Sequence, residues 1–124
     1  MTPKKSAKEK APVPTREAPQ AEVMKTYTVG LDDLAEADLD TISDQRTVGT
    51  ILRRVQALAT EPAVQGKALT GDLQGYRSIR AAGQRYRVIY EVIEAQTAVE
   101  IVVIGIRREG HKSDAYEIAE KRLT

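Results

Sequence analysis

Residues 76–90 read Tyr-Arg-Ser-Ile-Arg-Ala-Ala-Gly-Gln-Arg-Tyr-Arg-Val-Ile-Tyr, with Gly83 in the middle of the run. Tyrosines, arginines and branched aliphatic residues alternate on both sides of that glycine. Such alternation is typical of half-buried strands, and a glycine between two alternating runs marks a turn. The stretch therefore predicts a β-hairpin with strands at about 76–81 and 85–93.

Two further strand-like runs flank this hairpin in the sequence. Residues 98–107 are nearly all apolar, as a strand covered on both faces should be, and a turn at 94–97 precedes them. Tyr-Thr-Val is rich in β-forming residues and predicts a short strand at 27–31. Residues 66–75 carry three glycines and predict a loop that touches the core through two leucines.

Helical spacing replaces the strand pattern in three segments. Apolar residues recur near helical spacing between residues 31 and 42, with acids between them, which predicts a first helix. Asp44 is a good N-cap for a second helix, whose apolar stripe continues until Pro62 stops it. Asp114 and Glu117 stand at capping-box spacing and predict a C-terminal helix that ends near Leu123.

The predicted order of elements is β-α-α-β-β-β-α. We therefore expect an α+β fold in which a hairpin of helices packs on one face of a small, mainly antiparallel twisted sheet. In this arrangement the helices form an acidic outer layer. The opposite face of the sheet is left for the arginines.

Length and composition indicate one small domain with a tail. The chain has 124 residues, and its first 24 are rich in Lys, Ala and Pro. We expect a disordered or extended tail at 1–24 and a folded domain at 25–124. Met24 stands directly before the first strand, so either translation begins there or the segment is a plain solubilising tail.

The composition excludes several classes of protein. Because the chain has no Cys, disulfides and thiolate metal sites are ruled out. No apolar run approaches the roughly 18 residues of a membrane span, and the N-terminus lacks the apolar stretch of a secretory signal. We therefore expect a cytoplasmic protein with no membrane partner. A single His without any Cys makes a metal site unexpected, and no cofactor is predicted.

The net charge of +1 conceals a division of charge along the chain. Residues 31–61 carry seven acids and three arginines, whereas residues 76–112 carry seven lysines or arginines and four acids. The basic segment is the part that we expect to meet nucleic acid.

The hairpin supplies the first candidates for a binding site, which are Arg77, Arg80, Arg85 and Arg87. Residues 85 and 87 share one face of a strand about 7 Å apart, and they lie near residue 77 or 80 across the hairpin, depending on its register. Like charges placed side by side repel each other, so we interpret the cluster as a phosphate-binding face. The alternative is a solvated charged strand whose arginines pair with Glu91 and Glu94.

Further candidates stand just beyond the last strand. Arg107 and Arg108 lie where the chain leaves the sheet, a place from which functional side chains often project. His111 is either an ordinary surface residue or a group that transfers protons near neutral pH, and Lys112 follows it. Tyr116 falls in the first turn of the C-terminal helix, where packing is its simplest role. This set suits phosphoryl chemistry on RNA, because arginines stabilise charge that develops on a phosphate.

Four phrases of the sequence form a recognisable set. They are Leu-Thr-Gly-Asp-Leu-Gln-Gly-Tyr-Arg-Ser-Ile-Arg from Leu69, Gly-Gln-Arg-Tyr-Arg-Val-Ile-Tyr from Gly83, Ile-Gly-Ile-Arg-Arg from Ile104 and Asp-Ala-Tyr-Glu-Ile-Ala from Asp114. Together they resemble the RelE/ParE superfamily of toxins from type II toxin–antitoxin modules. The resemblance covers about residues 25–124, and the predicted order of elements is also that of the superfamily. It implies a RelE-like toxin that a cognate antitoxin binds in a hetero-oligomer.

The ribonuclease branch of the superfamily implies a metal-independent endoribonuclease that cleaves mRNA on the ribosome, with the 2′-hydroxyl of the mRNA as nucleophile. By resemblance, Arg87 stabilises the phosphate, Arg107 stabilises or protonates the leaving oxygen, and Tyr116 orients or stacks on the bases. Arginines occupy the positions where the best-known members carry lysines, so the proton acceptor is left open and His111 is a candidate. The catalytic candidates are Arg80, Arg87, Arg107, His111 and Tyr116, and the RNA-binding candidates are Arg77, Arg85, Arg108 and Lys112.

Two other functions stay open on the sequence. The gyrase-poisoning branch of the superfamily shares the fold but lacks a catalytic set. A toxin-like module that has lost its activity would serve as a binding or repressor subunit. The presence of Arg87, Arg107 and Tyr116 favours the nuclease.

Overall fold

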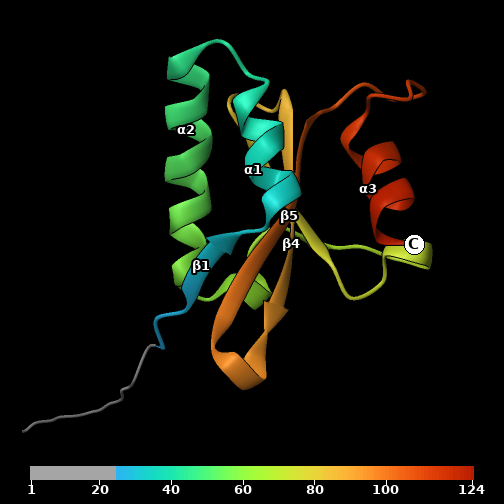
Figure 1. Cartoon of the computed structure of the whole chain (residues 1–124). Coiled ribbons are helices and arrows are strands. Elements are labelled where there is room, and N and C mark those ends of the chain that lie inside the picture. Colours follow the sequence, from blue (N-terminus) through green and yellow to red (C-terminus); the bar gives the residue numbers. More distant parts are fainter. Residues whose placement is uncertain (1–24) are drawn as a thin grey trace, which may run out of the picture.

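The computed structural model describes residues 25–124, which form a five-stranded sheet with helices on both sides (Figure 1). The strands are β1 (Thr28–Leu31), β2 (Lys67–Ala68), β3 (Arg77–Ala81), β4 (Tyr86–Ile93) and β5 (Ala98–Ile106), and the helices are α1 (Asp33–Asp40), α2 (Gln45–Gln56) and α3 (Ala115–Leu123). The predicted α+β fold is confirmed. The tail predicted at 1–24, including Met24, lies outside the described residues.

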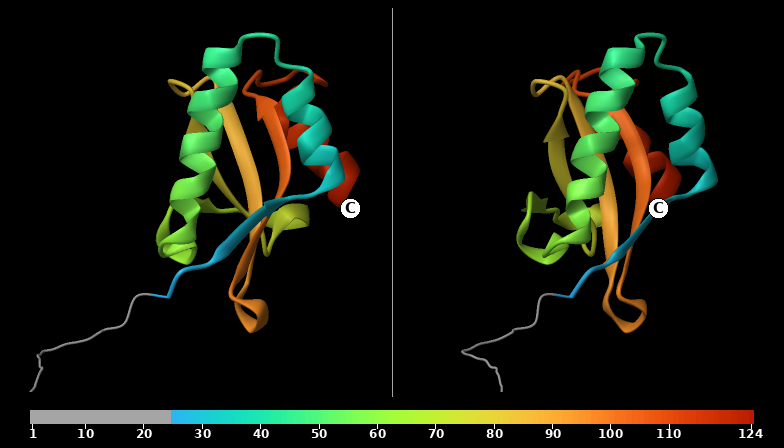
Figure 2. Two further views of the ribbon diagram at one scale, coloured as in Figure 1. Left: turned by 60° about the vertical axis from the view of Figure 1, so that its left-hand side comes forward. Right: turned by 90° about the vertical axis from the view of Figure 1, so that its left-hand side faces the viewer.

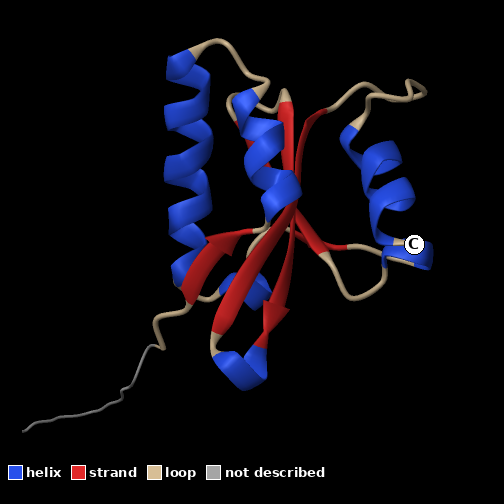
Figure 3. Cartoon of the chain, in the orientation of Figure 1, coloured by secondary structure: helices blue, strands red, loops and turns tan. Residues whose placement is uncertain are grey.

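The sheet has the strand order β1-β5-β4-β3-β2, with β1 parallel to β5 and every other pair antiparallel. Figure 3 shows the strands of this sheet in red and the helices in blue. A 3₁₀ turn, Glu94–Gln96, joins β4 to β5, as the expected turn at 94–97 requires. The sequence did not predict β2, which forms within the expected loop at 66–75. A Cβ at Gly66 would collide with the backbone oxygen of Ser78, so this glycine lets the chain approach β3 closely enough to pair.

Each helix begins after an aspartate whose side chain accepts a backbone N–H. Asp44 accepts from Arg46 at the start of α2, and Asp114 accepts from Tyr116 at the start of α3, as the sequence predicted for both N-caps. Asp32 caps α1 in the same way by accepting from Ala35, so that helix begins later than the apolar pattern suggested. The side-chain oxygens satisfy N–H groups that have no partner within the helix.

The sheet has a hydrophobic core on each face. The larger core lies under α1 and α2, where Ile51 and Leu58 pack against β4 and β5. The smaller core lies under α3 and includes Ile89, Val103 and Ala119. In Figure 2, α3 stands on the side of the sheet away from α2. The expectation that the face opposite the helical hairpin is free for arginines was therefore wrong in part, because α3 covers a portion of it. Over residues 25–124, no helix is both long and apolar enough to cross a bilayer.

Candidate phosphate-binding site

The register of the hairpin decides which arginines meet. Arg80 is the partner of Arg87, whereas Arg77 stands opposite Tyr90. Since successive side chains of a strand point to opposite faces, Arg80 and Arg87 share the face that α3 partly covers. Arg77 belongs to the other face, where its Nε donates to the backbone oxygen of Gln65 at 3.0 Å. The hairpin therefore contributes two of its four candidate arginines to one surface.

A hollow of about 630 Å³ opens on this surface between β2, β3, β4 and the start of α3. Its lining residues are Arg54, Gly66, Lys67, Ser78, Ile79, Arg80, Arg87, Arg107 and Tyr116. Five of these residues are cationic and none is acidic. The hollow thus gathers positive charge from α2, β2, β3, β4 and the segment that follows β5. Such an arrangement attracts a phosphate.

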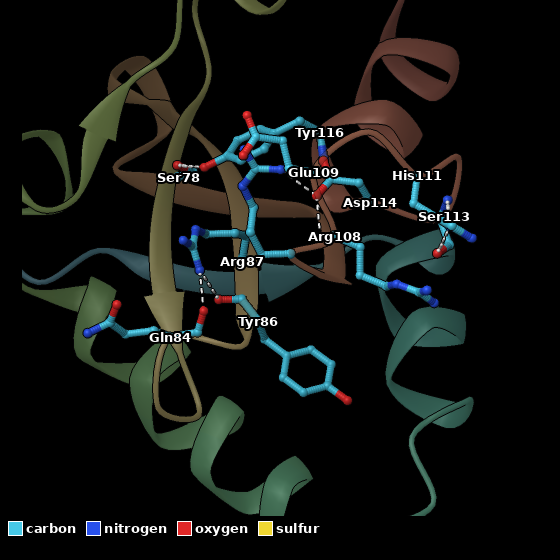
Figure 4. A network of polar contacts seen from close by, with 11 residues as sticks. Ser78, Gln84, Tyr86, Arg87, Arg108, Glu109, His111, Ser113, Asp114 and Tyr116 are labelled. Atoms are coloured by element: carbon cyan, nitrogen blue, oxygen red, sulfur yellow. Dashed lines mark hydrogen bonds and ion pairs between the residues drawn. The ribbon is translucent and has the colours of Figure 1, made fainter.

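Neutral oxygens hold most of the guanidinium groups in place. Arg87 Nη1 donates to the backbone oxygens of Gln84 at 2.6 Å and Tyr86 at 3.2 Å (Figure 4). Arg54 Nη1 donates to Gln65 Oε1 at 2.8 Å. Among residues 25–124, no carboxylate lies within 4.0 Å of either guanidinium. Neutral acceptors fix the side chains but leave their charge available to an anion.

Arg107 differs because it has a carboxylate partner. Its Nη1 lies 2.6 Å from Oδ1 of Asp114, a side chain that is only 2% exposed. Asp114 also accepts the backbone N–H groups of Arg108 at 2.6 Å and Tyr116 at 2.9 Å. The buried aspartate therefore fixes both the strand end that carries Arg107 and the helix start that carries Tyr116.

The pKa values of this pair move apart. Burial alone would raise the pKa of Asp114, but the hydrogen bonds from Arg107 and from two backbone N–H groups outweigh it and lower the pKa. The hydrogen bond to Asp114 in turn raises the pKa of Arg107. Arg107 therefore stays charged and acts as a fixed positive group.

Tyr116 is held at both ends of its side chain. Its ring lies under the guanidinium of Arg107, whose central carbon is 5.0 Å from the ring centre. Its hydroxyl shares a 2.9 Å hydrogen bond with Oγ of the buried Ser78 (Figure 4). A Cβ at Gly105 would come within 3.1 Å of Ala115, so the glycine lets α3 begin close to β5. Packing, the simplest role expected of Tyr116, is what these contacts show.

Four other candidates do not line the hollow. Arg85 precedes β4 and borders a separate groove with Asp44 and Thr47, so it does not share a surface with Arg87 as expected. Arg108 and Lys112 are exposed. His111 Nδ1 lies 2.7 Å from Oγ of Ser113, and this pair lies apart from Tyr116 and Arg87 in Figure 4. The structure therefore does not place the histidine where a bound phosphate would need a base.

Sequence reasoning missed two cations of the hollow, Arg54 and Lys67. Arg54 was counted within an acidic segment, yet α2 itself contains arginines and no acid. The acids of that segment belong to α1 and the flanking loops, so the expected acidic layer does not extend over α2. Lys67 lies in the segment that the sequence predicted to be a loop, where no alternation indicated a strand. The sequence did contain a signal for Arg54, because the segment that forms α2 carries arginines and no acid and precedes the basic hairpin.

A comparison with known protein families places this geometry in context. The model of the ParE toxin of the type II toxin–antitoxin system, parDE, matches residues 29–110. The chain belongs to this toxin family. The predicted membership of the RelE/ParE superfamily is thus confirmed. No curated protein matches the toxin's sequence.

Solved structures of toxins share the fold. The toxin is 29% identical to a chain of the RelBE2 toxin–antitoxin complex from Mycobacterium tuberculosis, with a TM-score of 0.59 over 66% of this chain and 92% of that chain. A free mutant of the E. coli toxin RelE matches with a TM-score of 0.63 and 18% identity, over 80% and 99% of the two chains. The chromosomal ParDE system from P. aeruginosa matches with a TM-score of 0.52 and 21% identity, over 64% and 95%.

Proposed function

We propose that the toxin is a metal-independent endoribonuclease that cleaves mRNA engaged on the ribosome. The observation that supports this function is the hollow in which Arg80, Arg87 and Arg107 converge while no acid lines it. A site that binds a phosphodiester and stabilises extra negative charge on it needs this arrangement. Because mRNA is the substrate, the cytoplasm is the compartment that we assign to the toxin.

The reaction that fits the hollow is an internal transesterification. The 2′-oxygen of one nucleotide forms a bond to the adjacent phosphorus, and the bond from phosphorus to the 5′-oxygen breaks. The products are a 2′,3′-cyclic phosphate and a 5′-hydroxyl. Arg80 and Arg87 stabilise the non-bridging oxygens, and Arg107 stabilises charge on the departing 5′-oxygen, which takes its proton from water. Arg107 serves as a charge and not as an acid, because Asp114 raises its pKa.

Lys67 is the residue that we assign as general base. A lysine amine can lose its proton and accept another, whereas a guanidinium cannot do so in a protein. Lys67 is the one lysine that lines the hollow among the described residues. In its neutral form it would accept the proton of the 2′-hydroxyl, a role for which the sequence had suggested His111.

Cleavage of mRNA in a ribosome-primed assay tests this function. We expect Arg87→Ala and Arg107→Ala each to reduce the cleavage rate by about 10²–10³-fold, since each removes a group that stabilises transition-state charge. Arg46→Ala is the matched control, because Arg46 is exposed on α2 and does not line this hollow. Full cleavage by the Arg87 variant would show that this hollow is not the active site, and a wild-type toxin that cleaves no mRNA would contradict the nuclease function.

Inhibition of DNA gyrase is the second candidate function. The family model that matches the chain carries the ParE name, and no histidine lines the hollow. On this alternative, the purified toxin blocks gyrase supercoiling, and its induction causes DNA breaks without cleaving mRNA. A chain that shows neither activity would instead be an inactive binding module.

We also propose that the toxin binds a cognate antitoxin. The solved RelBE2 and ParDE relatives are toxin–antitoxin complexes or systems. An antitoxin segment with acidic residues would complement the cationic hollow and block it. Co-expression of the toxin with its antitoxin should then restore growth and yield a stable complex.

A further inference from the structure

A second hollow, of about 410 Å³, adjoins the first on the side of α2. It is lined by Thr50, Arg53, Arg54, Ala57, Arg80, Ala81, Ala82, Gly83 and Gln84. Arg54 and Arg80 line both hollows. The two concave surfaces are therefore joined by a pair of arginines, and neither lining contains an acid.

Neutral side chains hold the guanidinium groups of the second hollow. Arg53 Nη2 donates to Thr50 Oγ1 at 3.3 Å, and Arg80 Nη1 donates to Gln84 Oε1 at 3.4 Å. Both acceptors are neutral. Within residues 25–124, no carboxylate lies within 4.0 Å of these guanidinium groups. The second hollow thus presents a positive charge that no described acid neutralises.

Protection of a strand edge explains only part of this charge. The short β2 pairs with Arg77 and Ser78, so the rest of β3 forms an open edge of the sheet. A charged residue such as Arg80 keeps an open edge from pairing with another chain. Arg53 and Arg54 lie in the last turn of α2, where cations stabilise the helix, and they do not protect the strand edge. Stabilisation of the helix does not require both of them to line the same hollow as Arg80.

We propose that the second hollow binds the phosphate of a nucleotide next to the scissile one. A single strand of RNA would then run from Arg107 across Arg87 and Arg80 to Arg53. Neighbouring strands lie about 4.8 Å apart, so the distance across the sheet from β5 to β3 is about 10 Å. Because one phosphate group is shorter than this distance, the row of arginines can contact more than one phosphate. The identity of the strand as RNA rests on the proposed function, whereas the charge and shape of the hollow do not.

Binding of RNA that cannot be cleaved tests the second hollow. The probe is 2′-O-methyl RNA, in which the attacking hydroxyl is blocked, as an oligomer of about eight nucleotides and as a dinucleotide. Arg53→Ala should weaken binding of the oligomer about tenfold, because one charge-assisted phosphate contact is lost. The slope of log affinity against log salt should fall by about 0.7. Binding of the dinucleotide, which the first hollow can hold alone, should not change.

Arg46→Ala is the control for a general loss of positive charge from α2, and it should leave both affinities unchanged. The proposal is overturned if Arg53→Ala behaves like Arg46→Ala. It is also overturned if Arg53→Ala spares RNA binding but weakens antitoxin binding, since the surface then serves the antitoxin. The urea midpoint of each variant confirms that it is folded.

The cleavage assay keeps this proposal separate from the proposed function. If the toxin cleaves no RNA but Arg53→Ala still weakens oligomer binding, the nuclease function fails and the nucleic-acid path stands. If cleavage depends on Arg87 but Arg53→Ala changes nothing, only the second hollow is assigned wrongly.

Discussion

At the scale of single residues, Asp114 connects more of the site than any arginine does. Its carboxylate meets the guanidinium of Arg107, the N–H of Arg108 and the N–H of Tyr116. Loss of its charge therefore loosens a strand end and a helix start together.

Asp114→Asn should destabilise the fold by about 2 kcal/mol at pH 7, because a nearly buried ion pair is broken while Arg107 keeps some access to water. The native pKa of Asp114 is lowered, so its contribution is present above the unfolded value of about 3.9 and is lost as the pH falls through the native value. The difference from wild type should therefore shrink below about pH 4, as urea unfolding at several pH values would show.

Glu109→Gln is the matched control for Asp114→Asn. Glu109 also faces Arg107, but at 3.9 Å and with its side chain 89% exposed. Surface pairs of this kind contribute little, so the variant should unfold like wild type. A loss of stability in Asp114→Asn that stays constant down to pH 3 would show that the charge of Asp114 is not the stabilising feature.

Part of the hollow could be predicted from the sequence. The resemblance and the strand alternation identified Arg80, Arg87, Arg107 and Tyr116, which the structure brings to one hollow. Alternation alone could not show whether Arg77 or Arg80 lies opposite Arg87. The hairpin register decides this, and it depends on the turn that Ala82 and Gly83 form with positive φ. The lining residues on α2 and β2 come from segments whose place depends on packing across the sheet, which no local pattern encodes.

At the scale of elements, the outer edge of β5 is closed by side chains where its strand partner ends. β1 pairs only with Ala98–Ile101. Beyond that point, Asp38 of α1 accepts the N–H of Ile104 at 2.9 Å, and Arg122 of α3 donates to the oxygen of Val102 at 2.9 Å. Two hydrogen bonds of 2.9 and 3.1 Å join Arg122 to Asp38, so the two helices are tied across the strand edge.

Arg122→Ala should destabilise the fold by about 2 kcal/mol, because it leaves Asp38 partly buried without its cation. Asp38→Ala should have a similar effect, and the double variant should lose less than the sum of the two. Hydrogen exchange should also become faster in α3. Lys121→Ala, which changes an exposed neighbour, is the control. Additive losses in the double variant would show that the two side chains do not act as a pair.

The elements themselves follow from the sequence more directly than the site does. The strands β4 and β5 and the two aspartate N-caps were predicted because each depends on a local pattern of alternation or capping. The two residues of β2 were not predicted, since Lys67 and Ala68 have no alternation and are exposed. They become a strand only because Gly66 permits contact with β3, which is a tertiary effect.

At the scale of the whole molecule, one sheet serves two cores. Neighbouring residues of β4 point to opposite faces, so Val88 belongs to the core under the helical hairpin and Ile89 to the core under α3. Both cores therefore depend on the same central strands. We expect the domain to unfold as one cooperative unit.

Substitutions in either core test this unity. Ile51→Ala in the larger core and Ile89→Ala in the smaller core should each cost about 2–5 kcal/mol, since both side chains are fully buried. Circular dichroism and tyrosine fluorescence should report the same urea midpoint in each variant. If the two signals give different urea midpoints in Ile89→Ala, part of the structure unfolds separately and the domain is not one unit.

The bare position at Gly105 has a consequence for other chains of this family. The absence of a side chain at this position lets the last helix stand close to the sheet. That distance in turn decides whether the hydroxyl of Tyr116 can form its hydrogen bond with Ser78. A relative with valine there would have to hold that helix farther out, which would weaken the contacts of its tyrosine. The residue at this single position therefore indicates, before any relative is purified, whether its tyrosine can be held in the same way.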